Sequence, residues 1–353
     1  MVLASPPGQY VSRLQEAGFR WACLPLKRSG VNPIREFLAV LGVTRLYRRE
    51  KPDLVHHFTL KCALYGSLAA RCTGIKAVMN AVTGVGYVYL SQDFKARLLR
   101  PLVNLVCRIG FRGTHVVFEN PDNRQMFIHH RIVSEDDSHV IRGAGVETTR
   151  FAPSPESSGV PIVLLAGRML WDKGVGEFVE AARRLKHDGL QVRFVLAGGC
   201  DPENPGAVPR ESLEEWTRTG AVEWWGQRED MPMVFSQAHV VCLPSYYGEG
   251  VPTVLMEAAA SGRAIVTTDM PGCREVVRHG ENGLLVPPRN PEALAEAIAT
   301  LLKDPALRAR MGARGREIAV QQFCEERVVR ETLELYRQLL GPKWPTPACA
   351  ERS

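Results

Sequence analysis

The chain has 353 residues, 45% of them apolar and 23% charged, which are the proportions of an ordinary soluble protein with two domains. Its first 150 residues carry 21 Lys and Arg against 11 Asp and Glu, and the remainder carries 23 against 27, so the basic first half suits an anionic acceptor or an acidic lipid surface. The sequence has no run of 18 apolar residues and no recognisable leader, which argues against a membrane-spanning or a secreted protein. Its nine cysteines are scattered without a CxxC pair, which argues against a disulfide framework or a zinc site. It has no nucleic-acid-binding signature. We therefore expect a cytoplasmic protein, with the inner face of the membrane as an alternative.

Apolar runs of strand length alternate with helical stretches over the first 150 residues, a pattern that predicts a parallel, doubly wound sheet. The expected strands are at 2–4, 19–26, 52–58, 76–82, 115–120 and 139–143. The expected helices are at 8–17, 32–49, 60–74, 93–110 and 121–130. Residues 143–160 gather Gly, Pro and Ser without periodicity, as an interdomain connection does.

Two features of this half carry functional hypotheses of limited specificity. His56 and His57 end the strand at 52–58, so one of them should face the cleft and the other the sheet packing, although a structural role is favoured for both. The loop TGVGY at 83–87 has a GxG without the full dinucleotide-binding fingerprint, which is a weak signal for an anion site.

The helix expected at 94–112 has an apolar side among Lys and Arg residues. Such a helix suits the surface of an anionic membrane, and a core-packed helix with a basic outer face is the equal alternative.

A second alternation of strands and helices begins at residue 161. Its strands are expected near 161–166, 190–197, 221–225, 238–243, 263–268 and 283–286. Its helices are expected near 174–187, 210–219, 230–236, 253–261 and 291–302, followed by helices at 305–319 and 325–340. We thus predict an α/β protein with two Rossmann-like doubly wound domains facing a central cleft: residues 1–150, residues 151–325, a helix at 326–340 that returns to the first domain, and a disordered tail at 341–353.

Arg168 and Lys173 follow the first strand of the second domain, within GRMLWDKG. Cations at a strand end beside the cleft are well placed to hold a diphosphate and to stabilise charge on a departing nucleoside diphosphate. The alternative, a pair of solvated cations at a helix start, is disfavoured because a helix N-terminus repels positive charge.

Two weaker signals follow the next two strands. Gly198 and Gly199 end one of them and would allow a ligand to approach the backbone closely, with a plain turn as the equal alternative. Gln227 and Arg228, which follow the next strand, could frame a flat base. Trp224 and Trp225 are expected to belong to the core.

The most informative stretch is SYYGEGVPTVLMEAAASG at 245–262, which predicts a Gly-rich loop followed by a helix. Free N–H groups at the start of a helix suit a phosphate. Glu249 in the loop and Glu257 in the helix would repel that phosphate, so they more plausibly accept hydrogen bonds from hydroxyl groups on either side of it. A diphosphate between two hydroxyl-bearing groups describes a nucleotide sugar. The alternative is a structural strand–loop–helix unit with two solvated glutamates.

These residues resemble the family 4 retaining glycosyltransferases of the GT-B fold. The most specific match is the Glu-x7-Glu pair, Glu249 and Glu257, within PSYYGEGVPTVLMEAAASG, and GRMLWDKG matches the family's Arg and Lys. HHFTLKCALYGSLAAR and NAVTGVGYVYL resemble a bacterial subgroup that builds surface polysaccharides on undecaprenyl-diphosphate-linked sugars from UDP-hexoses or UDP-N-acetylhexosamines.

The resemblance implies a role for each matching position. Arg168 and Lys173 would hold the donor diphosphate together with loop residue Gly250 and the N–H groups of Thr253 and Val254, without an obligatory metal or cofactor. Glu249 would bind the transferred sugar, and Glu257 the ribose diol.

Two departures from the family pattern concern the first domain. Thr83 stands where many relatives carry a histidine, so that histidine's role has no counterpart here. The family's first strand and Gly-rich loop would precede Met1, so we expect unpaired strand edges and exposed apolar surface. A non-catalytic subunit of a glycan-assembly complex and a sugar-nucleotide epimerase are the alternative functions.

Overall fold

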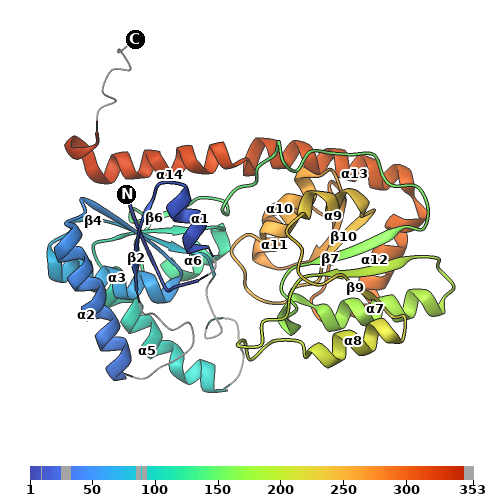
Figure 1. Ribbon diagram of the computed structural model, residues 1–353, viewed down its shortest axis with the longest axis horizontal. Coiled ribbons are helices and arrows are strands. Elements are labelled where there is room, and N and C mark those ends of the chain that lie inside the picture. The colour runs from blue at the N-terminus through green and yellow to red at the C-terminus, as the bar shows by residue number, and fades with distance from the viewer. Residues whose placement is uncertain (9, 25–32, 85–88, 90–93, 346–353) are drawn as a thin grey trace, which may run out of the picture.

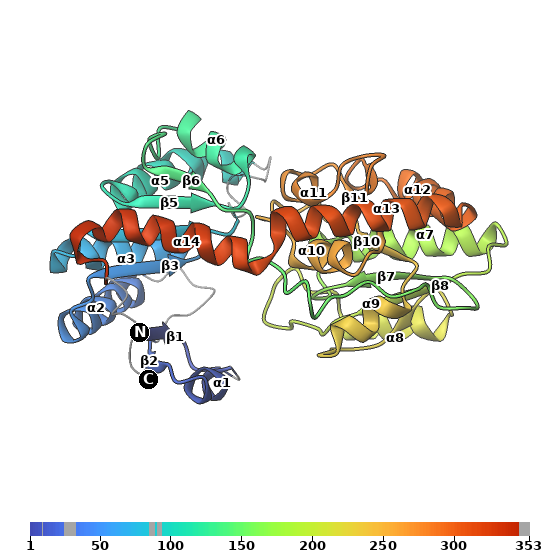
Figure 2. The ribbon, with the colours of Figure 1, turned by 90° about the horizontal axis from the view of Figure 1, so that it is seen from above.

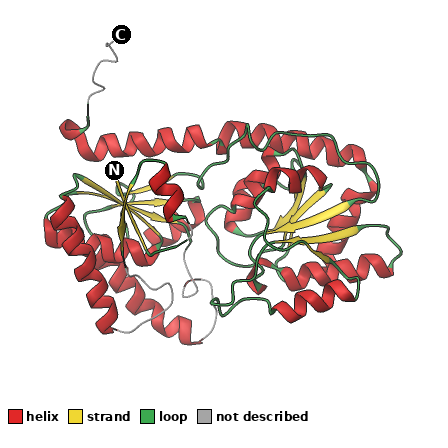
Figure 3. Cartoon of the chain, viewed as in Figure 1, coloured by secondary structure: helices red, strands yellow, loops and turns green. Residues whose placement is uncertain are grey.

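The structure is a computed structural model that describes residues 1–8, 10–24, 33–84, 89 and 94–345 (Figure 1). It consists of two α/β domains, each with helices packed around a parallel sheet (Figure 3). This confirms the predicted architecture of two Rossmann-like domains. The loop at 83–87 and the tail at 341–353 lie partly outside the described residues. The prediction that the whole tail is disordered is wrong for its start, because Gly341–Lys343 form a 3-10 turn that continues from the last helix.

The N-terminal domain is built on a four-stranded parallel sheet in the order β3-β4-β5-β6. All six residues of β4 are buried, because helices cover both of its faces. The strands are β3 (Leu54–Phe58), β4 (Ala77–Val82), β5 (His115–Phe118) and β6 (Ser138–Val140), and the helices are α2 (Pro33–Glu50), α3 (Leu60–Thr73), α5 (Phe94–Phe111) and α6 (Pro121–His129).

The first elements of the chain stand apart from this sheet. β1 (Val2–Ser5) and β2 (Arg20–Cys23), with α1 (Val11–Glu16), form a separate two-stranded parallel sheet (Figure 2). Among the described residues β3 therefore has a strand on one side only, as expected for a sheet edge left unpaired.

The C-terminal domain has a six-stranded parallel sheet in the order β12-β11-β10-β7-β8-β9. Its central strands are fully buried and alternate between two apolar clusters, one on each face of the sheet. The strands are β7 (Ile162–Ala166), β8 (Arg193–Ala197), β9 (Glu223–Trp224), β10 (Val240–Leu243), β11 (Ala264–Thr268) and β12 (Gly283–Val286). The helices are the 3-10 turn η1 (Trp171–Lys173), α7 (Val175–His187), α8 (Arg210–Arg218), α9 (Met231–Gln237), α10 (Thr253–Ala260), α11 (Pro271–Val276) and α12 (Pro291–Lys303).

The last helices connect the two domains (Figure 2). α13 (Pro305–Ile318) packs on the C-terminal domain, and a five-residue π-helix, Ala319–Phe323, leads into α14 (Glu325–Leu340), which lies along the N-terminal sheet. Leu335 of α14 is buried against Met79, Val117 and Ile141. The final helix therefore braces the N-terminal domain.

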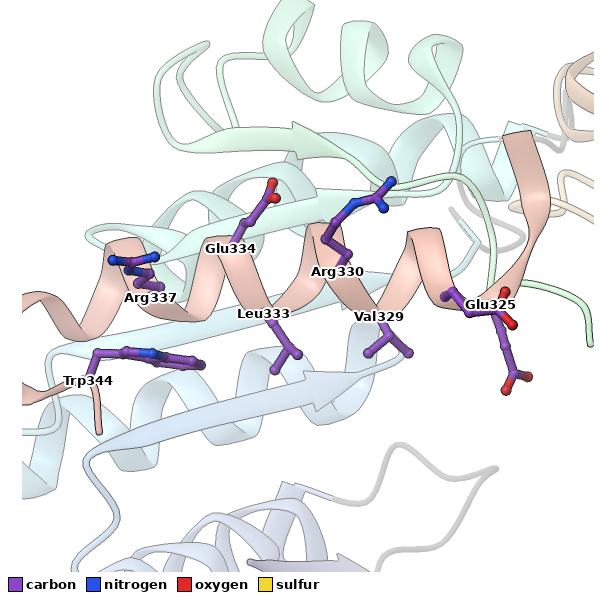
Figure 4. A pocket seen from close by; sticks show the side chains of 8 residues that line it. Glu325, Val329, Arg330, Leu333, Glu334, Arg337 and Trp344 are labelled. Atoms are coloured by element: carbon purple, nitrogen blue, oxygen red, sulfur yellow. The ribbon is translucent and has the colours of Figure 1, made fainter. Parts of the chain in front are cut away.

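A shallow groove of about 560 Å³ runs along the outer side of α14 (Figure 4). Val329, Leu333 and Trp344 lie on one side of this helix, and Val329 and Leu333 remain 53% and 44% exposed. This side of α14 therefore carries exposed apolar side chains.

The prediction that one of the two histidines faces the cleft is wrong. His57 is buried, with Nδ1 2.7 Å from Asn80 Oδ1 and Nε2 2.6 Å from the Tyr47 hydroxyl. His56 pairs through Nδ1 with the Tyr336 hydroxyl of α14 at 2.6 Å. Both rings contact other elements of the N-terminal domain and α14 instead of the cleft, because β3 lies at the sheet edge between α14 on one face and α2 and α3 on the other.

Candidate active site

A cleft of about 850 Å³ lies between the two domains, at the carboxyl ends of the strands, where a doubly wound fold places its ligand. Both domains contribute to its walls. The predicted residues that line it are Thr83, Arg168, Lys173, Gly198, Gly199, Gln227, Arg228, Glu249, Gly250, Thr253, Val254 and Glu257.

The Gly-rich loop after β10 is fixed from within its own domain by Ser245. The Ser245 hydroxyl donates to Glu249 Oε1 at 2.8 Å and lies 3.1 Å from the Asp172 carbonyl oxygen, while Thr268 donates to the Ser245 carbonyl. α10 then begins at Thr253, with Pro252 as its N-cap residue and no side-chain cap. Because the first N–H groups of a helix have no partner within it, those of Thr253 and Val254, which line the cleft, are available to donate to an anion.

Each predicted cation is paired with a carboxylate. Lys173 Nζ lies 2.5 Å from Glu249 Oε2, and both side chains are more than four-fifths buried. Arg168 lies 2.9 Å from Asp201 Oδ2 and remains about half exposed. The sequence predicted that Lys173 and Glu249 contact different parts of one ligand. The structure adds that the two are directly coupled.

Glu257 projects into the cleft from α10. Its carboxylate has no hydrogen bond or ion pair to another described residue. Burial raises its pKa to about 7, and Arg150 opposes this rise. A partly buried carboxylate without a partner is suited to accept hydrogen bonds from ligand hydroxyl groups.

The glycines of the cleft have different reasons for lacking a side chain. A Cβ at Gly198 would lie 1.7 Å from the Gly167 carbonyl oxygen, so packing inside the domain is sufficient to require glycine there. At Gly199 a Cβ would lie 2.5 Å from Gln227 Oε1. A Cβ at Gly250 would lie 1.9 Å from Glu119 Oε2, so the absence of a side chain here leaves room for Glu119 of the N-terminal domain. The sequence predicted that a ligand approaches the backbone at Gly198 and Gly199. The atoms that a side chain would meet at these positions are protein atoms.

Two further expectations concern β9 and the turn after it. Trp224 and Trp225 pack against the two apolar clusters of the domain, as expected of core residues. Arg228 is paired with Asp230, 2.8 Å from Nε to Oδ1, so Gln227 is the more available group of the pair that was expected to frame a base.

Three residues were not identified from the sequence as functional: Glu119 and Asp172, which line the cleft, and Asn120, which is buried beside Glu119. Glu119 and Asn120 follow β5 and reach the Gly-rich loop of the other domain. Asp172 directly precedes Lys173 in the chain and lines the cleft, with Oδ1 buried and without a partner among the described residues, and burial raises its pKa. The available signal was their position directly after a strand or within the motif GRMLWDKG.

Among the residues that the structure describes, no three or more His, Cys, Asp or Glu side chains gather as they would at a metal site. In the same part of the chain, no helix is long and apolar enough to cross a bilayer.

The arrangement can hold an anion between two hydroxyl-bearing groups. Lys173, Arg168 and the start of α10 supply positive potential at the centre of the cleft, and Glu249 and Glu257 supply acceptors within it. Transfer of a group from a departing anion is the chemistry that this distribution of charge favours.

Comparison with known proteins agrees with this geometry. Residues 160–304 match the family model "Glycosyl transferases group 1", and residues 1–120 match "Glycosyl transferase 4-like". The chain is 30% identical over 349 residues to N,N'-diacetylbacillosaminyl-diphospho-undecaprenol alpha-1,3-N-acetylgalactosaminyltransferase of Campylobacter jejuni, with 95% of this chain and 90% of that protein covered. It is 22% identical over 329 residues to the capsular polysaccharide biosynthesis glycosyltransferase CapM of Staphylococcus aureus, with 90% and 84% covered.

A solved structure shows the same fold. The Anabaena protein Alr3699/HepE, crystallised in complex with UDP, superposes with a TM-score of 0.75 at 18% identity, covering 96% of this chain and 92% of that one.

Proposed function

Because the chain belongs to the glycosyltransferases of the group 1 and 4-like families, we propose that it moves a hexose or N-acetylhexosamine from a UDP-sugar to a polyprenyl-diphosphate-linked sugar, with retention of configuration. Membership of this family makes the chain a GT-B glycosyltransferase that acts on a glycan or a lipid-linked acceptor. The observation that carries the finer proposal is one cleft that brings together Glu249, Glu257, the cations Arg168 and Lys173, and the start of α10.

In this proposal the donor diphosphate binds at the centre of the cleft. Lys173 and Arg168 neutralise it, and the N–H groups of Thr253 and Val254 donate to its oxygens. Glu257 accepts hydrogen bonds from the ribose hydroxyls, and Glu249 from the sugar. The UDP bound by the Anabaena protein and the lipid-linked acceptor in the name of the Campylobacter relative support the two substrate classes.

The reaction forms a bond between the acceptor oxygen and the anomeric carbon, and it breaks the bond from that carbon to the diphosphate. The acceptor attacks on the face that the diphosphate leaves, so the configuration is retained, and a diphosphate oxygen takes the acceptor proton. Lys173 and Arg168 stabilise the charge that develops on the leaving group, so the proposal requires no bound metal or other cofactor.

The proposal is tested with a panel of UDP- and GDP-sugars assayed for transfer to a membrane extract. We expect transfer from one or a few UDP-sugars and none from GDP-sugars. Calorimetry with UDP separates the alternatives: a folded protein that does not bind UDP would be a non-catalytic subunit. Turnover of UDP-N-acetylglucosamine without an acceptor would instead identify an epimerase.

Donor binding should strengthen as the pH rises through about 7, because Glu257 must be ionised to accept hydrogen bonds from both ribose hydroxyls. With a pKa of about 7, its ionised fraction rises about tenfold between roughly pH 6 and 8. We therefore expect the donor KM to fall about tenfold over this interval. In Glu257→Gln the KM should be high at every pH, and a variant that kept the pH dependence would show that another group titrates.

We also propose that the N-terminal domain rests on an anionic membrane through α5. Val103, Cys107 and Phe111 pack into the core, so the inner face of this helix agrees with the alternative of a core-packed helix. Its outer face, however, is apolar and not simply basic. It exposes 79% of Phe94, 70% of Leu98, 58% of Leu102 and 51% of Ile109, at helical spacing and flanked by Arg97 and Arg112.

Replacing Leu98 and Leu102 together by serine should weaken binding to phosphatidylglycerol vesicles at least fivefold, because the variant removes apolar area that would enter the lipid. Co-sedimentation measures the binding, with phosphatidylcholine vesicles as the neutral comparison. The control replaces Val329 and Leu333, which are also exposed, on α14, by serine and should bind like the wild type. Equal binding to both lipids, or equal loss in both variants, would contradict a specific role for α5.

A further inference from the structure

The Gly-rich loop that carries Glu249 is held by the other domain as well as by its own. Gly250 N donates to the Thr83 carbonyl at 3.0 Å, and the neighbouring Gly84 pairs with Glu249 as an antiparallel bridge. Val251 N donates to Glu119 Oε2 at 2.7 Å. The backbone of the loop is therefore bound at successive residues by the N-terminal domain.

Asn120 contributes to this contact from a buried position. Its Oδ1 accepts from Asn123 N at 2.8 Å and so caps α6, while Nδ2 donates to the carbonyls of Gly250 at 2.9 Å and Glu249 at 3.3 Å. One side chain thus ties the start of a helix in the first domain to the loop of the second.

The opposite side of the loop is closed by its own domain. A Cβ at Gly272, in α11, would lie 2.1 Å from the Gly250 carbonyl oxygen, so α11 touches the loop backbone. Ion pairs flank the contact on either side: Arg142 with Glu275 at 2.8 Å, and Arg274 with Asp122 at 3.4 Å. The loop lies between two surfaces, and its position depends on both.

We propose that Glu119 and Asn120 form an interdomain latch that positions Glu249 for sugar transfer. They are positioning residues, because they bind the loop backbone and act on the substrate only through Glu249. The inference rests on the proposed function for its catalytic consequence, but the latch itself is a property of the protein without substrate. It implies that the first domain helps to build the donor site.

Glu119 makes the latch sensitive to pH. Its pKa is raised to about 7, mainly by burial and also by the nearby Glu249 carboxylate, while the hydrogen bond from the Val251 N–H opposes the rise. The ionised carboxylate is the stronger acceptor, so the latch tightens as the pH rises through this value. The charged groups that share the cleft with Glu119 are Arg168, Asp172, Lys173, Arg228, Glu249 and Glu257, and Asp122 and Arg274 flank it.

Hydrogen exchange tests the latch without any ligand. Asn120→Asp keeps the oxygen that caps α6 and loses the amide that binds the loop. We expect exchange in the segment 245–256 to become at least tenfold faster in this variant and in Glu119→Ala, with α7 unchanged. Asn290→Asp is the matched control, because Asn290 caps α12 in the same way and does not reach the other domain. Unchanged exchange in both latch variants would overturn the proposal.

Comparing UDP binding with kcat then distinguishes a role in positioning Glu249 from a purely structural role. We expect the latch variants to bind UDP within about twofold of the wild type. Their kcat for transfer from UDP-N-acetylglucosamine or UDP-N-acetylgalactosamine to a membrane extract should fall at least tenfold.

The pH profile adds a readout that a structural role would not move. The wild-type kcat should rise about fivefold as Glu119 ionises, whereas Glu119→Gln should keep the low value throughout. A Gln variant with the wild-type profile would remove the pH-sensitive part of the proposal. If the wild type binds no UDP, the proposed function fails, and the exchange result still decides the latch.

Discussion

Glu249→Gln should lower kcat for sugar transfer about 10²- to 10³-fold while UDP still binds. Gln has the same shape, but it lacks the charge that holds Lys173 and that, in the proposed function, would bind the sugar hydroxyls strongly. Because that contact would strengthen as charge develops at the reacting carbon, its loss should appear in kcat more than in KM. Single-turnover transfer from the active UDP-sugar measures it.

Glu180→Gln provides the control, since Glu180 lies exposed on α7 and is paired only loosely with Arg183 at 3.7 Å. Its activity should match that of the wild type. Full transferase activity in Glu249→Gln would show that this carboxylate is not part of the transfer site, and the assignment of the Glu-x7-Glu pair would fail with it.

Much of the fold could be predicted because apolar runs of strand length are unambiguous where a strand is buried on both faces. The strands at β4, β7, β10 and β11 were expected within a few residues of their observed bounds. The helix α11 was missed: PGCREV is only six residues long and has no apolar period to distinguish it from a turn. The apolar pattern also could not predict which strands pair. Nothing in the sequence of β1 and β2 indicates that they form a sheet separate from the main one.

The donor side of the site could be predicted because its residues lie in two compact motifs directly after strands. The sequence placed Lys173 and Glu249 in one cleft, but only the fold shows that they contact each other, 76 residues apart in the chain. Glu119 and Asn120 could not be found in this way. Their partners are backbone groups more than 120 residues away, and backbone groups leave no signal in the sequence.

Lys173→Ala should weaken UDP binding about tenfold and lower kcat/KM for transfer about 10²- to 10³-fold. Among the described cations that line the cleft Lys173 is mostly buried, so in the proposed function its charge would act on the diphosphate with little screening by solvent, and more strongly as the leaving group gains charge. The variant also leaves the Glu249 carboxylate without its cation. Arg168→Ala should have a smaller effect, because Arg168 is half exposed. Calorimetry with UDP and initial rates of transfer measure the two parts.

The double variant Lys173→Ala with Glu249→Gln decides whether the ion pair works as a unit. Each single change already removes the contact between Nζ and Oε2, so the double variant should lose much less than the product of the two single losses. Losses that multiply would mean that the two groups act independently, the lysine on the diphosphate and the glutamate on the sugar. Lys303→Ala, an exposed lysine at the end of α12, should leave both UDP binding and transfer unchanged. Losses that do not multiply would therefore support a donor site in which the ion pair seen without ligand stays part of the machinery when the donor binds.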